Sequence, residues 1–209
     1  MPQEKSATSD YKMRWGGLLE IPVVSRIHRA CLDGGKVDAL ARVLKKYDLA
    51  DLLDVGCGLG ENSVIKREIR YLGLDNSFSR VLYASRCYRQ RYFICGNAFN
   101  LPFKDRCFDS SLLANTSHHL NDKDFRETLL EMKRVTKRYL IIDDAVKTEG
   151  QGRFSAFLYN LDRGGHYRYQ KEMREILISL GNVRLLGADH FVTFPGFYSH
   201  VVFVLEVIS

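Results

Sequence analysis

The feature that most constrains this chain is a short apolar stretch that runs into closely spaced glycines. Residues 52–60 read Leu-Leu-Asp-Val-Gly-Cys-Gly-Leu-Gly, so glycine stands at every second position after the valine. Glycine lacks a Cβ atom and tolerates positive φ, so a strand can end here in a tight turn that another molecule approaches closely. We expect a helix over residues 61–68, whose first N–H groups would face the same crevice. This arrangement indicates a nucleotide-type ligand.

The spacing of the glycines separates two kinds of nucleotide site. A dinucleotide fingerprint, GxGxxG, needs its third glycine at position 61, which is Glu61, so an NAD-dependent oxidoreductase is the least favoured function. The observed order is DxGxGxG, and it resembles the first motif of the class I S-adenosylmethionine (SAM)-dependent methyltransferases. SAM carries no pyrophosphate, and its loop needs close backbone approach. The resemblance implies SAM as cofactor, S-adenosylhomocysteine as its product, and cofactor contacts from Asp54, Gly56, Cys57, Gly58 and Gly60.

Length and composition predict a soluble globular protein. The chain has 209 residues, 45% of them hydrophobic and 27% charged, which suits one domain. No apolar run approaches the roughly 20 residues of a membrane span, and the polar N-terminus lacks the core of a signal peptide, so we expect a cytoplasmic protein. The net charge of +6 favours acidic partners. The densest basic run, residues 80–91, is spaced like the outer face of a helix, which favours a solvated face over a nucleic-acid patch.

The cysteines predict neither disulfides nor a metal centre. Their number is odd and no CxxC pair occurs, which is typical of free thiols in a reducing compartment. No cluster of cysteine and histidine has the spacing of zinc or iron–sulfur ligands, so we expect no metal. Cys57 fits as a small residue in the tight turn. The five cysteines are Cys31, Cys57, Cys87, Cys95 and Cys107.

Strand and helix patterns alternate beyond residue 50. The predicted strands are residues 51–55, 71–75, 92–95, 109–115, 138–143, 183–193 and 199–207. The predicted helices are residues 18–31, 36–47, 61–68, 78–89, 122–135 and 170–180. The strands from 51 to 143 are continuous apolar runs, as in a parallel sheet covered on both faces. Pro195-Gly196 separates the last two, which predicts an antiparallel hairpin that closes the sheet.

A second motif lies at the end of the second predicted strand. Asp75 stands 19 positions after Gly56, where a carboxylate can accept hydrogen bonds from both ribose hydroxyls of a bound nucleoside. The alternative is a helix N-cap, because Asp, Asn and Ser all favour that position. The spacing from the glycine loop favours ribose binding. Asn76, which follows, belongs to the same predicted cofactor site.

A third motif follows the third predicted strand. Residues 96–103 and 108–109 resemble the family pattern G-D-A-x-x-L-P-F followed by F-D. The family's aspartate contacts the adenine amino group, whereas this chain has Asn97, whose carbonyl oxygen can accept the same hydrogen bond without charge. Ala98 would offer its backbone N–H to the ring. Phe99 fits either the core or the adenine face.

A fourth motif carries the first candidate bases. The apolar run before Asn115 emerges into Thr-Ser-His-His-Leu, and in the resembling enzymes this turn lies beside the methionine part of SAM. Asn115 would present its carbonyl to the cofactor ammonium. A neutral imidazole can remove a proton near pH 7, so His118 and His119 are candidate general bases. The alternative is that one or both pack in the core, with methyl transfer driven by positioning alone.

A last candidate segment follows the fifth predicted strand. Residues 161–169 read Leu-Asp-Arg-Gly-Gly-His-Tyr-Arg-Tyr and are similar to the D-x-G-G-H-x-R stretch of many small-molecule methyltransferases of this superfamily. Flexible glycines, aromatic faces and arginines suit a cover over a planar or anionic substrate. We expect substrate contacts from Arg163, Tyr167 and Arg168, with His166 as a third candidate base. The alternative is a surface loop whose tyrosines pack on the core.

Together these motifs predict an α/β fold. The resemblance implies a Rossmann-like, doubly wound, mostly parallel seven-stranded sheet with an antiparallel C-terminal hairpin strand and N-terminal helices. We expect one domain over residues 1–209, with residues 1–48 as an N-terminal helical cap and residues 147–169 as a lid-like insertion.

The expected function is methyl transfer from SAM to an oxygen or carbon nucleophile of a small molecule. One alternative is an RNA or tRNA methyltransferase that uses the positive charge for phosphate contacts. Another is a non-catalytic SAM-binding partner of a second protein. The sequence leaves the acceptor and the oligomeric state open.

Overall fold

The computed structural model of the protein describes residues 35–149, 159, 165–193, 196 and 198–208. The predicted helix over residues 18–31 and most of the predicted N-terminal cap lie outside the described residues.

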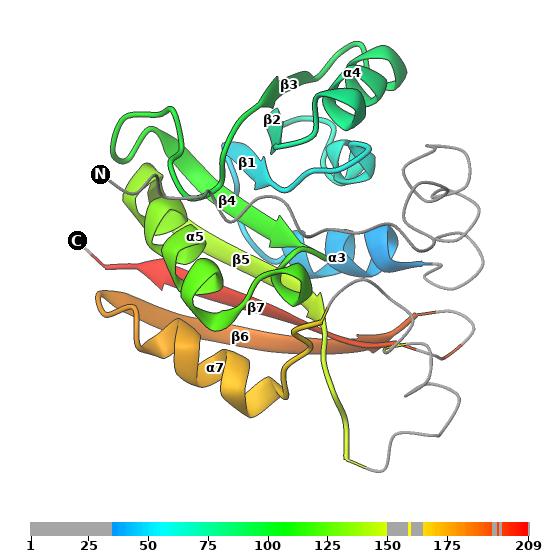
Figure 1. The fold of residues 1–209 in the computed structure, drawn as a ribbon. Coiled ribbons are helices and arrows are strands. Elements are labelled where there is room, and N and C mark those ends of the chain that lie inside the picture. Colours follow the sequence, from blue (N-terminus) through cyan, green and yellow to red (C-terminus); the bar gives the residue numbers. More distant parts are fainter. Residues whose placement is uncertain (1–34, 150–158, 160–164, 194–195, 197, 209) are drawn as a thin grey trace, which may run out of the picture.

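A seven-stranded sheet forms the centre of the molecule (Figure 1). Its strands are β1 (Asp51–Val55), β2 (Arg70–Asp75), β3 (Tyr92–Cys95), β4 (Phe108–Ala114), β5 (Thr136–Ala145), β6 (Val183–Val192) and β7 (Ser199–Val207). Their order in the sheet is β3-β2-β1-β4-β5-β7-β6. The first five strands pair in parallel, and β7 lies antiparallel between β5 and β6. The predicted fold class is confirmed, including the reversed C-terminal strand.

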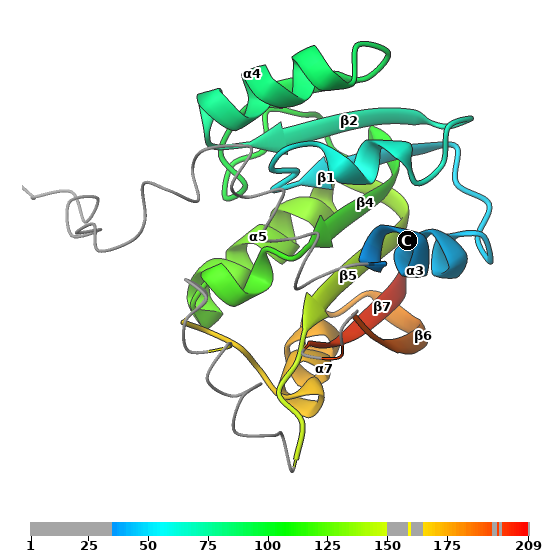
Figure 2. The ribbon, with the colours of Figure 1, turned by 90° about the vertical axis from the view of Figure 1, so that its right-hand side faces the viewer.

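Helices cover both faces of this sheet (Figure 2). They are α3 (Lys36–Leu44), α4 (Phe78–Cys87), α5 (Asp122–Val135) and α7 (Gln170–Ile178), with short 3₁₀ turns η1 (Glu61–Val64) and η2 (Ser117–His119). Alternate residues of β1 separate the two cores, because Leu53 packs with α5 and α7 whereas Leu52 packs with α3. Burial on both sides explains why the parallel strands read as continuous apolar runs.

Helix α5 shows how local sequence fixes an element. It begins where the Asn121 side chain accepts the backbone N–H of Asp124 at 2.9 Å. Asp122 and Asp124 in its first turn, and Lys133 in its last turn, complement the helix dipole. Its start and end are those predicted, because both caps are local.

The predicted helix over residues 61–68 is wrong, because the structure has only the four-residue turn η1 there. Nine residues, 61–69, must carry the chain back along the sheet to the start of β2. A five-residue strand spans about 16 Å, whereas nine residues of α-helix span about 13 Å and leave nothing for a turn. A 3₁₀ turn, which rises about 2 Å per residue, followed by extended chain covers the distance.

The basic run 80–91 has both exposed arginines and one that is tied to the backbone. Arg86 and Arg89 of the basic run are exposed, while Arg91 donates to the carbonyls of Lys66 and Ile69. Within the described ranges no helix is long and apolar enough to cross a bilayer, and no group of three or more His, Cys, Asp or Glu is arranged to hold a metal ion. The described cysteines are all free thiols: Cys57, Cys87, Cys95 and Cys107.

Candidate functional site

The sequence motifs converge on the carboxyl edge of the parallel strands. In the order β3-β2-β1-β4-β5, the chain moves outward from β1 in one direction and then returns to add β4 on the other side. A crevice opens at such a switch point, because the connections after β1 and β4 leave toward opposite faces. The glycine loop follows β1, Asp75 ends β2, and the histidine turn follows β4. The fold therefore brings the predicted cofactor residues to one edge of the sheet.

The three glycines of the loop do different things. All have positive φ: +73° at Gly56, +55° at Gly58 and +81° at Gly60. A Cβ atom on Gly56 would lie 2.6 Å from the Thr116 hydroxyl, and one on Gly60 would lie 2.8 Å from the Phe93 ring. A Cβ atom on Gly58 would meet no atom of the described residues within 4 Å. Gly56 and Gly60 are thus required by packing, whereas Gly58 borders open space at the crevice.

Cys57 is a structural member of the loop. Its backbone N–H donates to the Leu74 carbonyl at 3.0 Å, beside the N–H of Gly56 at 2.7 Å, so the loop is tied to the end of β2. Burial, reinforced by the nearby Asp54 and Asp75 carboxylates, raises the pKa of the Cys57 thiol far above its usual range. The thiol stays protonated and acts as a small apolar filler, as the sequence predicted.

Asp75 links the glycine loop to the start of α4. Its Oδ2 accepts the Gly58 N–H at 2.9 Å, and its Oδ1 accepts the Ser77 N–H at 2.9 Å. The N-cap residue of α4 is Ser77, so the alternative of Asp75 as that helix's N-cap is wrong. Each carboxylate oxygen has further acceptor capacity, which two adjacent sugar hydroxyls would use.

Asp54 is the least satisfied polar group of the loop. It is fully buried, and its Oδ2 accepts the Tyr71 hydroxyl at 2.5 Å and the Asn62 amide at 3.2 Å. Its Oδ1 has no hydrogen-bond partner among the described residues. Burial raises the pKa of Asp54 to about 7, against the two donors, which lower it. A buried acceptor without a donor calls for one from outside, and a cationic ligand would supply it.

The predicted adenine contacts are only partly available. The Asn97 carbonyl oxygen already accepts the Phe99 N–H at 2.9 Å, so the side chain closes a local turn. The Phe99 ring is 39% exposed, which makes it an aromatic surface and not a core residue. Ala98 is half-buried and Asn76 is exposed beside the end of β2.

The turn after β4 starts with a strained residue. Asn115 has φ +51°, and its N–H donates to the Asp143 carbonyl at 2.8 Å. Asparagine tolerates this left-handed conformation better than most residues. The chain therefore leaves β4 sharply, and η2 begins two residues later at Ser117.

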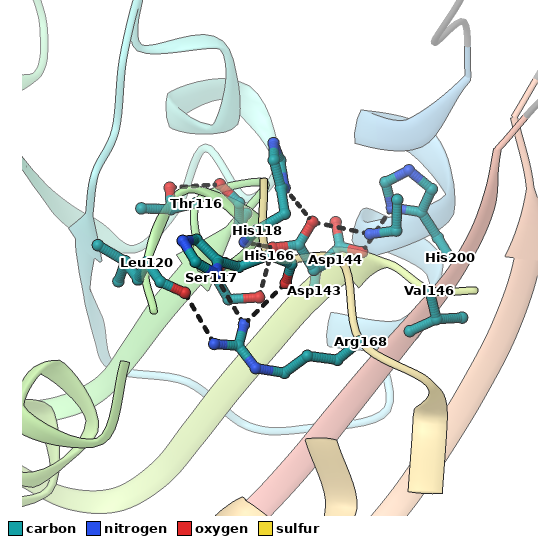
Figure 3. A network of polar contacts seen from close by, with 12 residues as sticks. Thr116, Ser117, His118, Leu120, Asp143, Asp144, Val146, His166, Arg168 and His200 are labelled. Atoms are coloured by element: carbon teal, nitrogen blue, oxygen red, sulfur yellow. Dashed lines mark hydrogen bonds and ion pairs between the residues drawn. The ribbon is translucent and has the colours of Figure 1, made fainter. Parts of the chain in front are cut away.

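His118 is paired with a carboxylate that the sequence analysis missed. Its Nδ1 lies 2.6 Å from Asp144 Oδ1, and its backbone N–H donates to Asp144 Oδ2 at 3.1 Å (Figure 3). Asp144 Oδ2 also accepts the Ser117 hydroxyl at 2.6 Å. Asp144 is fully buried, yet His118 and these donors hold its pKa well below its usual range. An ionised Asp144 fixes the hydrogen on Nδ1 of His118.

The other two candidate bases surround His118. The His119 ring lies 4.1 Å from the His118 ring, and the His166 backbone N–H donates to the His118 carbonyl at 3.0 Å. The Tyr167 ring stacks on His118 at 4.7 Å, with 4° between the planes. His166 and Tyr167 also line a cavity of about 440 Å³. The structure thus joins the histidine turn to the segment after β5.

Arg168 contacts the turn that carries His118. Its side chain is buried, and its guanidinium donates to the backbone carbonyls of Ser117, Leu120 and His166 and pairs with Asp122. A guanidinium engaged in this way holds the turn together. Arg168 also lines the cavity beside His166, and its substrate contact stays a prediction. Arg163, the other predicted substrate arginine, lies outside the described residues.

A signal for Asp144 existed in the sequence. The apolar run of β5 ends in Asp143-Asp144, as that of β2 ends in Asp75, at the same edge of the sheet. Asp143 pairs with His200 of β7 at 3.1 Å, and its Oδ2 has no partner among the described residues. His200 has no sequence motif around it, because its partner comes from a distant strand.

A model of a methyltransferase domain family matches residues 53–141. This part of the chain is a class I methyltransferase domain of the type 11 family. The match runs from β1 to β5 and so contains the glycine loop, Asp75 and the histidine turn. It ends before Asp144, Tyr167 and Arg168, so these groups around His118 lie outside the matched region.

Relatives of this methyltransferase domain have several functions. Demethylmenaquinone methyltransferase of Thermotoga maritima is 36% identical over 91 residues, 42% of this chain and 39% of that protein. A probable tRNA methyltransferase 9B of Bos taurus is 33% identical over 85 residues, 40% of this chain and 18% of that protein. The matches cover less than half the length of these relatives.

A solved structure shares the fold over most of the chain. Magnesium protoporphyrin IX methyltransferase of Synechocystis, determined with bound S-adenosylhomocysteine, has a TM-score of 0.70 at 18% identity. The likeness covers 92% of this chain and 97% of that one. It extends the shared fold beyond residues 53–141 to the C-terminal strands.

Proposed function

We propose that this chain is a methyltransferase that moves the methyl group of SAM to an oxygen or acidic carbon of a small-molecule acceptor. The observation that carries the proposal is the difference between the loop glycines. Gly56 and Gly60 are explained by packing, whereas Gly58 has positive φ and faces open space beside two buried carboxylates. Positive φ favours glycine at position 58, and the space beside it leaves room for a ligand next to the Asp75 carboxylate that accepts its N–H.

The residues at this edge fit SAM. Asp54 offers an unpartnered buried oxygen to a cationic group, and Asp75 offers acceptors to the ribose hydroxyls. The exposed Phe99 ring offers a face to adenine. When bound, SAM supplies an electrophilic methyl group on a sulfonium, and S-adenosylhomocysteine is left after transfer. The loop residues contribute binding and orientation.

His118 is our candidate for the general base. Its Nδ1 holds a hydrogen against Asp144, which leaves Nε2 as the basic nitrogen of the neutral ring. With SAM and an acceptor bound, Nε2 would accept the proton that the acceptor loses, and His118 would then be an imidazolium. The buried Asp144 carboxylate stabilises that charge. His119 and His166 are alternative bases, because both lie beside His118.

A small molecule is the favoured acceptor. Two similar proteins carry the names of small-molecule acceptors, demethylmenaquinone and magnesium protoporphyrin IX. Tyr159, Tyr167 and Tyr198 form an aromatic cluster next to His118, which would suit a planar ring. RNA is a second candidate, favoured by the similarity to the bovine tRNA methyltransferase and by the charge of +6. Location in the cytoplasm stays a prediction.

Isothermal titration calorimetry with SAM tests the cofactor site. We expect Asp75→Asn to weaken SAM binding at least about tenfold, the effect of losing a charged hydrogen-bond acceptor. Asp109→Asn is the matched control. Asp109 is a buried carboxylate that accepts the Ala50 N–H at 3.0 Å, but it lies at the opposite edge of the sheet. Equal SAM affinity in both variants and the unchanged protein would refute the site.

Transfer of a labelled methyl group from SAM tests the reaction and its acceptor. The protein is incubated with the label and with either fractionated small metabolites or bulk tRNA. We expect product in a metabolite fraction, and a His118→Gln variant with a lower rate but unchanged SAM affinity. Labelled tRNA would support the second candidate. SAM binding without transfer to either would favour a non-catalytic partner protein.

A further inference from the structure

We propose that Arg168 and Tyr167 are positioning residues that hold His118 in place from outside the matched methyltransferase domain. The inference rests on the proposed function for its catalytic meaning, because it concerns the candidate base. Its structural content stands on hydrogen bonds between two segments about 50 residues apart in the chain.

The Arg168 guanidinium binds the carbonyls on both sides of His118. Nη1 donates to the Ser117 carbonyl at 2.9 Å, and Nη2 donates to the Leu120 carbonyl at 2.7 Å (Figure 3). Arginine is suited to this task, because its planar fork presents several donors in fixed directions. The turn that carries His118 is therefore spanned by one rigid group.

The surroundings of Arg168 indicate a built site and not a chance contact. The residue is only 4% exposed, and burying a charge is costly unless its donors are satisfied. Nε and Nη2 pair with Asp122 at the start of α5, and the guanidinium lies 4.6 Å from the centre of the Phe125 ring. Hydrogen bonds, an ion pair and a cation–π contact thus compensate the burial.

The same segment contacts His118 in two further ways. The His166 N–H donates to the His118 carbonyl, and the Tyr167 ring lies flat on the imidazole. Asp144 holds the ring edge and the backbone N–H of His118 from β5. The histidine is therefore fixed on its ring edge, its ring face, its N–H and its carbonyl. That number of constraints exceeds what packing alone requires and suits a base that must keep one orientation.

The contacts also change the interpretation of the predicted lid. The Lys147 N–H donates to the Arg168 carbonyl at 2.9 Å, so the two ends of the segment after β5 are tied to each other. Arg168 in turn ties them to the histidine turn. The described C-terminal part of the predicted lid, residues 165–169, is thus a support beneath the candidate base. A ligand that contacts residues 165–169 would therefore contact the same segment that holds His118.

The hydrogen on His118 Nδ1 gives a direct test by proton NMR. A proton on a histidine nitrogen that lies 2.6 Å from a buried carboxylate oxygen resonates at low field and exchanges slowly with water. We expect this signal in the unchanged protein, and we expect Asp144→Asn to remove it and so assign it. In Arg168→Met we expect its exchange with water to quicken about tenfold or more, as for the loss of a buried charged hydrogen bond.

Arg126→Met is the matched control. Arg126 also binds a serine hydroxyl and a backbone carbonyl, those of Ser179, but it lies on the exposed side of α5. Its loss should leave the His118 signal unchanged. Arg168→Lys keeps the charge without the fork, so we expect an intermediate exchange rate; it also serves if Arg168→Met does not fold.

A His118 signal that is identical in a folded Arg168 variant and the unchanged protein would overturn the inference, even if the melting temperature fell. SAM calorimetry on the same variants separates this outcome from failure of the proposed function. We expect SAM affinity within twofold of the unchanged protein. Absence of SAM binding in the unchanged protein would remove the proposed function and leave the positioning result intact.

Discussion

Asp54 should make the stability of the fold depend on pH in an unusual direction. Its folded-state pKa is about 7, whereas an unfolded aspartate titrates near 3.8. The folded state therefore holds a proton more tightly than the unfolded state. The contribution of Asp54 to the unfolding free energy is therefore highest below about pH 4 and falls as the pH rises toward 7. Above pH 7 both states are ionised and the dependence ends.

The magnitude follows from the pKa difference. Each pH unit between the two pKa values is worth about 1.4 kcal/mol, so the interval from pH 5 to pH 7 amounts to about 3 kcal/mol. Asp54→Asn cannot ionise and removes this contribution. Other groups titrate alike in both proteins, so they cancel when the variant is compared with the unchanged chain. The difference in unfolding free energy, variant minus unchanged protein, should therefore be about 3 kcal/mol larger at pH 8 than at pH 5.

Urea unfolding of both proteins at about pH 5 and about pH 8 measures this difference. The difference arises because burial without a donor on Oδ1 opposes the charged form of Asp54. A difference in unfolding free energy that stays the same at both pH values would refute the reasoning. A bound cation should favour the ionised form of Asp54, so the affinity of the unchanged protein for SAM should rise with pH up to about 7. Calorimetry should find no such rise in Asp54→Asn.

Two more predictions follow from the contacts at this edge. Gly58→Ala should lower the unfolding free energy by only about 1–2 kcal/mol, because residue 58 has positive φ, yet it should abolish SAM binding. Gly60→Ala should lower the unfolding free energy further, because its Cβ atom would also clash with Phe93. Urea unfolding and SAM calorimetry on both variants separate the two roles, and equal losses of unfolding free energy would contradict them. Asp144→Asn should lower the unfolding free energy at pH 7 by about 3–5 kcal/mol, since it leaves His118 without its charged partner. This difference in unfolding free energy should shrink as the pH falls below about 4, where the lowered pKa of Asp144 stabilises the unchanged protein less. A difference that stays the same in acid would count against an ionised Asp144.

Much of the fold was predictable because its signals are local. Strands β1, β3 and β7 and helix α5 have their predicted bounds, since each is limited by turn residues or by a cap such as Asn121. The segment after the glycine loop was not predictable from propensity. Its conformation is set by the distance that nine residues must span, which depends on where β2 pairs with β1.

The candidate site was predictable where neighbouring residues in the sequence make it. The glycine loop and Asp75 belong to short motifs, and the structure places them together. The roles of Asp144 and Arg168 depend on partners 26 and 51 residues away, His118 and Ser117. The sequence shows that Asp144 ends an apolar strand, but a single sequence carries no pattern that identifies the distant partner of Asp144 or of Arg168. An arginine beside glycines and tyrosines indicates a ligand contact, whereas its bonds to backbone carbonyls are seen only in the fold.

Two buried carboxylates at this edge of the sheet differ in charge because their donors differ. Asp54 has two donors on one oxygen and none on the other, and burial raises its pKa to about 7. Asp144 is equally buried, but His118, Ser117 and two backbone N–H groups saturate both of its oxygens, and its pKa lies below the usual range. Asp144 is therefore ionised down to strongly acidic pH, whereas Asp54 would ionise beside a bound cation. Under the proposed function, this difference between two acids, set by their surroundings, would suit methyl transfer from a cationic donor to an acceptor that loses a proton.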